Sequence, residues 1–105
     1  MTPKPHMIAM VTFLTRDEGG WSQRHWSGVK PALKVKNGTF TSCIVWGQSE
    51  DQMFEPGVEY EVRLELLVWK DYCNEVYSGM PVQLNEGSRV VGRGSVVAII
   101  AEQVR

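Results

Sequence analysis

The chain has 105 residues, 43% of them hydrophobic, and a formal net charge of −1, which suits one hydrophobic core and is too short for two ordinary domains. It contains no run of about 18 apolar residues, so no membrane-spanning helix is expected. The first residues lack the apolar centre of a secretory signal, so we expect a cytoplasmic protein with no membrane partner.

Strand signals dominate from residue 7 onward. Residues 7–15 form an apolar and β-branched run that is too short and too rich in Thr and Val to favour a helix. Asn37-Gly38 is typical of a tight hairpin turn in which both residues have positive φ, and Pro56-Gly57 indicates another turn. Six strands are therefore expected, at residues 7–15, 32–36, 39–46, 59–69, 81–84 and 89–100.

The segment 59–69 has the clearest alternation, with apolar side chains from Tyr60 to Val68 expected to face inward and charged ones outward. Six strands without a convincing helix predict an all-β fold, a single closed six-stranded antiparallel β-barrel. We expect the barrel to span residues 7–105, after a flexible N-terminal segment at residues 1–6. The predicted core includes Val62, Leu64, Leu66, Val96 and Ile99.

Charge is distributed unevenly along the chain. Residues 1–36 hold six Lys and Arg against two acids, residues 37–86 hold two against nine, and the tail from Gly87 is basic again. Because a barrel brings its first and last strands together, the basic segments are expected to share one face and the acidic middle to cover another. Such polarity can steer an anionic partner, although an ordinary solvated surface is an alternative.

The sequence offers little for catalysis. It has no Gly-x-x-x-x-Gly-Lys-Ser/Thr phosphate loop, and His6 and His25 lack the surroundings of a zinc site. Cys43 and Cys73 lack metal-ligand spacing; one disulfide could form, but two buried reduced thiols suit a cytosolic protein better. We expect a non-catalytic chain with no cofactor and no metal.

Two glycine-bearing segments near opposite ends of the chain carry a family resemblance. The first contains Glu18-Gly19-Gly20 and ends in Gly28-Val29-Lys30-Pro31, and the second reads Glu-Gly-Ser-Arg-Val-Val-Gly-Arg-Gly from Glu86. In order and spacing they resemble the C-terminal, third β-barrel domain of translation elongation factor Tu. That barrel has a Glu-Gly-Gly turn, a loop ending in Gly-aromatic-Arg-Pro, and a last hairpin close to Glu-Gly-Gly-Arg-x-Val-Gly-x-Gly-Val-Val. The resemblance covers about residues 7–100.

The resemblance implies a six-stranded barrel without the GTPase domain, related to one that contacts the T-stem of aminoacyl-tRNA through phosphates and riboses. Such contacts suit A-form RNA, which is recognised by shape and 2′-hydroxyls. The candidate RNA-binding residues are Lys30, Arg24, Thr41, Ser42, Gly87, Ser88, Arg89 and Arg93. For Arg89, an equal alternative to RNA binding is that its side chain braces the turn.

Three of these positions depart from the family pattern. Lys30 keeps the charge of the family's arginine but loses its planar fork. Ser88 replaces a glycine, and Arg93 stands where the family prefers a small residue.

Apolar residues expected outside the barrel form a second candidate set, because exposed apolar patches usually mark partner surfaces. Covering by loops or by the N-terminal segment is the alternative. The candidate protein-interface residues are Trp21, Trp26, Ile8, Met10, Leu14, Leu67 and Trp69.

Three classes of function remain open. The first is a translation-associated domain that binds tRNA or another structured RNA. The second is a mimic of the elongation factor barrel, such as a decoy or immunity-type protein, that engages a protein which normally docks on elongation factor Tu. The third is a homo-oligomeric barrel.

Overall fold

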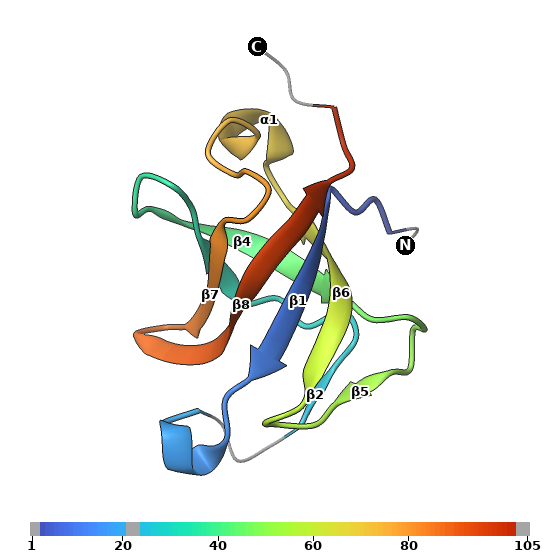
Figure 1. Ribbon diagram of the computed structural model, residues 1–105, viewed down its shortest axis with the longest axis vertical. Coiled ribbons are helices and arrows are strands. Elements are labelled where there is room, and N and C mark those ends of the chain that lie inside the picture. Colours follow the sequence, from blue (N-terminus) through green and yellow to red (C-terminus); the bar gives the residue numbers. More distant parts are fainter. Residues whose placement is uncertain (1–2, 21–23, 103–105) are drawn as a thin grey trace.

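The computed structural model describes residues 3–20 and 24–102. Six strands form a closed antiparallel barrel in the order β1-β6-β4-β3-β7-β8 (Figure 1), which confirms the predicted fold class. Each of the six has a partner on both sides, so the barrel has no free edge. The strands are β1 (Met7–Phe13), β3 (Ala32–Lys34), β4 (Phe40–Trp46), β6 (Glu59–Leu66), β7 (Pro81–Glu86) and β8 (Arg89–Ile99).

Short elements lie at the two ends of the barrel. One end carries the 3-10 helix η1 (Arg16–Glu18) and a small sheet of β2 (His25–Trp26) and β5 (Met53–Phe54), and the other carries the short helix α1 (Trp69–Tyr72) (Figure 1). The sequence did not predict β2, β5 or α1. Within the described ranges no helix has the length and apolar character needed to cross a membrane.

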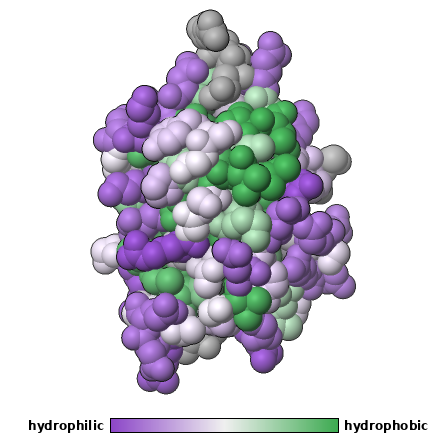
Figure 2. Space-filling model, viewed as in Figure 1, coloured by the Kyte–Doolittle hydropathy of each residue, from purple (hydrophilic) through white to green (hydrophobic). Residues whose placement is uncertain are grey.

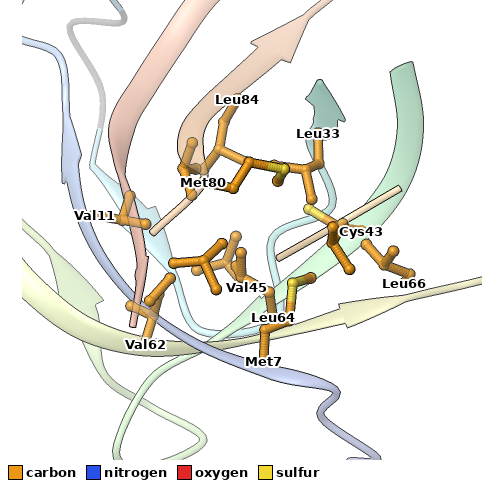
Figure 3. Packing of buried hydrophobic residues seen from close by; sticks show 14 of the residues in the cluster. Met7, Val11, Leu33, Cys43, Val45, Val62, Leu64, Leu66, Met80 and Leu84 are labelled. Carbon is orange, nitrogen blue, oxygen red and sulfur yellow. The ribbon is translucent and has the colours of Figure 1, made fainter. Parts of the chain in front are cut away.

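The barrel interior is filled by alternate side chains of its strands. In β1 every second residue from Met7 to Phe13 is buried, as the period of a strand requires. Figure 3 shows side chains of β3, β4, β6 and β7 meeting in one interior. The predicted core residues Val62, Leu64, Leu66 and Val96 are buried, and Ile99 packs against the core half-buried.

The prediction for segment 59–69 is wrong at its C-terminal end. β6 stops at Leu66, Val68 is exposed rather than inward, and Trp69 begins α1. The reason lies in the neighbouring strand, where the backbone pairing of β1 ends with Met7 opposite Leu64. Beyond that point the His6 imidazole Nδ1 accepts the hydrogen bond of the Leu66 amide at 3.0 Å, so the β1–β6 ladder ends there and the chain turns.

The predicted geometry of the Asn37-Gly38 turn is also wrong. Gly38 has φ 89°, but no non-glycine residue among those described has positive φ. The Asn37 side-chain oxygen instead accepts the Thr39 amide at 2.8 Å, and the Val35 amide donates to the Thr39 carbonyl. One glycine therefore suffices for this hairpin. The turn expected at Pro56-Gly57 is present, with Gly57 at φ 83°.

β8 is the longest strand and is irregular at two points. Its register shifts once against β1 and once against β7, leaving Val97 and Val91 as the extra residues of two β-bulges. Bulges bend a strand and increase its twist, which lets β8 pair with β1 on one side and β7 on the other. Between the bulges, Gly94 lies so close to β1 that an added Cβ would overlap the carbonyl oxygen of Met10.

Candidate functional site

The outer surface of the barrel is polarised in charge. In the barrel β7 lies between β3 and β8, and β6 lies across the barrel from β7. The outer positions of β6 are largely acidic, at Glu59, Glu61 and Glu65. We expected the first and last strands to share a basic face, but β1 contributes no basic residue, and the cations lie instead on the two sides of β7, along β3 and β8. The exposed cations on and beside β3 and β8, called the basic face from here on, are Lys30, Lys34, Lys36, Arg89 and Arg93.

Lys30, Ser42 and Gly87 come to the same end of β3. Ala32 pairs with both Ser42 of β4 and Asn85 of β7. Lys30 lies two residues before Ala32 and Gly87 two residues after Asn85, so both continue past the same end of this antiparallel ladder. All three candidates are exposed, and Gly87 has φ 61° in the turn that it forms with Ser88.

Arg93 lies farther along the barrel. It is exposed on β8, opposite Gln83 of β7 and Thr12 of β1. Because Arg89 and Arg93 lie opposite Glu86 and Gln83, three residues apart on β7, they are roughly 10 Å apart at about 3.3 Å per strand residue. Lys34 of β3 shares an open pocket with Gln83, so Arg93 and Lys34 lie on the two sides of the same β7 residue.

Three RNA-binding candidates have intramolecular roles. Thr41 is only 6% exposed, which takes its side chain out of the surface. Arg24 forms an exposed ion pair with Glu55 at 3.0 Å. Arg89 donates from Nη1 to the Gly20 carbonyl at 3.2 Å, so it braces the loop after η1 while remaining exposed.

A continuous apolar area lies over the N-terminal end of β1 and the C-terminal end of β8 (Figure 2). Ile8 and Met10 are half-buried on β1, and Ile8 pairs with Ala98. Val97 and Ile100 are exposed beside them. The sequence did not indicate the β8 contribution; beyond the bulge at Val97 the alternation shifts by one residue, so that Ile99 packs against the core and Ile100 is exposed. The β1–β8 apolar patch, as it is called below, consists of Ile8, Met10, Val97, Ala98 and Ile100.

Two of the predicted interface residues are not free apolar surface. Leu14 is buried, since the chain leaves β1 after Phe13 and folds Gly20 against it. Trp69 is half-buried, with its ring stacked on His6 at 4.5 Å between centroids and its Nε1 donating to the Glu102 carbonyl at 2.9 Å.

The other interface candidates lie apart from the patch. Leu67 is 53% exposed, but its amide donates to Ser42 of β4, which places it on the side of β6 away from β1. Trp26 is exposed on β2, opposite Met53 of β5. Trp21 falls outside the described residues.

His6 lies just before β1, within the segment that was expected to be flexible, and contacts three other parts of the chain. Besides its bond to Leu66 and its stacking on Trp69, its carbonyl accepts the amides of Ile100 and Ala101. Partial burial lowers the pKa of His6 below its ordinary value, and the nearby carboxylate of Glu65 acts in the opposite direction. The neutral imidazole is therefore the form that the fold favours.

His25 anchors β2 to the barrel. It is buried, its Nε2 lies 3.1 Å from the carboxylate of Glu86 in β7, and its ring stacks on Phe13 at 4.6 Å. This arrangement ties β2 to the end of the hairpin that carries Gly87.

The residues that the structure describes contain no cluster of metal-ligating side chains and no exposed thiol. Within residues 3–20 and 24–102 no three His, Cys, Asp or Glu side chains are grouped as metal ligands would be. Cys43 and Cys73 are buried free cysteines. Burial raises the pKa of the Cys43 thiol to about 12, and a protonated thiol is a poor nucleophile.

No protein-family model matches the chain. The resemblance to the third domain of elongation factor Tu therefore rests on the motifs quoted above.

Proposed function

We propose that the chain is a non-catalytic, cytoplasmic binding domain that contacts tRNA or another structured RNA through its basic face. The observation that carries this proposal is the grouping of five exposed cations on and beside β3 and β8, opposite the acidic β6. Phosphates attract such a surface, and binding releases their counterions.

The end of β3 supplies the groups that suit an A-form helix. Lys30 offers a phosphate contact, and the Ser42 hydroxyl can donate to or accept from a ribose 2′-hydroxyl. Gly87 carries no side chain, and apart from its neighbours in the chain no atom lies within 4 Å of the position that a Cβ would occupy there. An RNA backbone can therefore approach the turn closely. These contacts read shape and not sequence.

Charge reversal on the two faces tests the proposal. Fluorescence anisotropy with a labelled tRNA, between about 50 and 200 mM salt, gives the affinity and its salt dependence. Arg93→Glu should weaken binding and reduce the salt slope by about one unit, because one phosphate contact is lost. Adding Lys30→Glu should reduce the slope by about one unit more.

The matched control is Arg63→Glu, the same change on the outer face of the acidic β6, where Arg63 lies 3.6 Å from Glu61. It should leave the salt slope within about half a unit of wild type. Equal losses for Arg93→Glu and Arg63→Glu, or no binding by wild type, would contradict the proposal.

The β1–β8 apolar patch supports a second candidate function, in which the barrel binds a protein. That partner is either a protein that docks on elongation factor Tu or a second copy of the chain. Exposed apolar patches mark such surfaces. Light scattering of wild type and Val97→Lys tests the homo-oligomer, since Val97 is 52% exposed. A monomeric wild type would exclude self-association. A protein that is captured in a pull-down equally well at low and high salt would favour the partner that docks on elongation factor Tu.

A further inference from the structure

An open pocket of about 250 Å³ lies on the basic face. It is formed where β3 ends and where the chain enters β7. This volume is below the roughly 300–1,000 Å³ of pockets that enclose drug-sized ligands, so it suits a group no larger than one ring system. The lining residues are Lys34, Val35, Lys36, Tyr77, Met80, Pro81 and Gln83.

One part of the pocket is apolar. Val35 and Met80 are each 3% exposed and belong to the barrel core, so they offer a firm floor. Tyr77 is 46% exposed, so an aromatic ring lines the pocket while remaining open to solvent. Exposed aromatic rings are the platforms on which proteins stack unpaired bases.

The rest of the pocket is polar and cationic. Lys34 and Lys36 bring two ammonium groups, and Gln83 brings an amide. The Gln83 Nε2 donates to the Asn85 side chain at 3.1 Å, which fixes the amide and leaves its oxygen as an acceptor for an amino or imino group. The carboxylate of Glu75, which approaches this hairpin, accepts the Asn37 amide at 3.2 Å.

We propose that this pocket binds one unpaired nucleotide of the RNA, with the base against Tyr77 and its flanking phosphates at Lys34 and Lys36. The proposal rests on the proposed RNA-binding function and adds a ligand class to it, namely a structured RNA with a splayed-out base. The basic face leads to the pocket, because Arg93 lies opposite Gln83, one of its lining residues. Base recognition in unstacked positions is the usual route to RNA specificity.

An acidic protein segment is the competing occupant, since carboxylates can also pair with lysines. The exposed aromatic ring, the oriented amide and the small volume of the pocket together favour a base. The acidic segment is therefore treated as an outcome of the test.

The test uses two RNA hairpins, both ending in a 3′-phosphate, that differ by one unpaired 3′ nucleotide, which carries 2-aminopurine. Wild type should bind the extended hairpin about 10-fold more tightly, the scale of one base–aromatic stack, and should quench the 2-aminopurine. Tyr77→Ala should abolish this gain and leave the affinity for the blunt hairpin within about 2-fold of wild type. Tyr77→Phe is the matched control and should retain the gain. The methyl resonance of Met80 should shift with the extended hairpin only.

Each alternative result has a distinct meaning. If wild type binds both hairpins equally, or if Tyr77→Ala keeps the gain, the pocket proposal is overturned while the RNA-binding function stands. If wild type binds neither hairpin, both proposals fail. If a Glu-rich peptide binds at the Tyr77 pocket and neither RNA does, the acidic segment is the occupant.

Discussion

Two glycines of β8 provide a matched pair for testing how the barrel closes. Gly94 and Gly92 differ in what an added methyl group would meet. At Gly94 the neighbours are backbone atoms of β1, namely the Met10 carbonyl oxygen and carbon and, at 3.0 Å, the Val11 Cα. At Gly92 the nearest atom is the Leu84 Cδ1 at 3.2 Å, the end of a side chain that can rotate away. We expect Gly94→Ala to be much more destabilising than Gly92→Ala.

The magnitude follows from these contacts. Because the Met10 carbonyl oxygen would overlap the added carbon and non-bonded atoms need roughly 3–4 Å between them, β8 would have to move by more than about 1 Å at Gly94. Overpacking costs about 1–3 kcal/mol, and each distorted ladder hydrogen bond costs about 1 kcal/mol, so Gly94→Ala should lower the free energy of unfolding by about 2–4 kcal/mol. Gly92→Ala should stay within about 1 kcal/mol of wild type, because restricting the unfolded chain offsets the local crowding.

Urea unfolding followed by tryptophan fluorescence and by circular dichroism gives the free energy of unfolding for both variants. In thermal unfolding, the Gly94→Ala loss corresponds to a Tm roughly 10–20 °C lower for a domain of this size. If Gly94→Ala is no less stable than Gly92→Ala, β8 does not lie against β1 as described, and the argument for a closed barrel at this seam is wrong.

Three further predictions concern the core, the pH response and the thiols. Leu64→Ala should cost about 2–5 kcal/mol in urea unfolding because the side chain is fully buried, whereas Leu67→Ala on the exposed turn should change stability by less than about 0.5 kcal/mol. Because the pKa of His6 is lower in the folded than in the unfolded chain, the unfolded state takes up the proton first, and the free energy of unfolding should fall as pH drops below about 6.5. His6→Asn should flatten this dependence of stability on pH between about pH 7 and 5.5. An equal dependence in wild type and variant would contradict the role given to His6. With its pKa at about 12, Cys43 should react with a thiol reagent at pH 8 only as fast as the protein unfolds, and rapid native labelling would show that it is accessible.

The sequence was sufficient for the fold class because apolar and β-branched runs bounded by turn residues marked six strands. Alternation within residues 59–69 predicted which side chains of β6 face inward as far as Leu66, and turn residues at Gly38 and Gly57 separated the strands. Errors arose where a contact distant in sequence decides the local structure. β6 ends where the His6 side chain replaces a strand partner, and no pattern within residues 59–69 contains that information.

The candidate site was predicted less completely for the same reason. Motif positions indicated Lys30, Ser42 and Gly87, and the ladder brings these to one end of β3. Thr41 was misplaced because it and Ser42 point to opposite faces of β4, and Leu14 because Gly20 folds against it. The Tyr77 pocket lacks any local motif, since its walls come from two segments about 40 residues apart.

The position of β1 between β6 and β8 has a consequence for how the molecule folds. β1 is the first strand along the chain, yet one of its two edges pairs only with β8, the last described strand. During synthesis about 80 residues follow β1 before its partner on that edge has been made. Until then it presents an apolar strand edge that other chains could join. Such long-range pairing also places the protein among the slow folders, in the millisecond-to-second range.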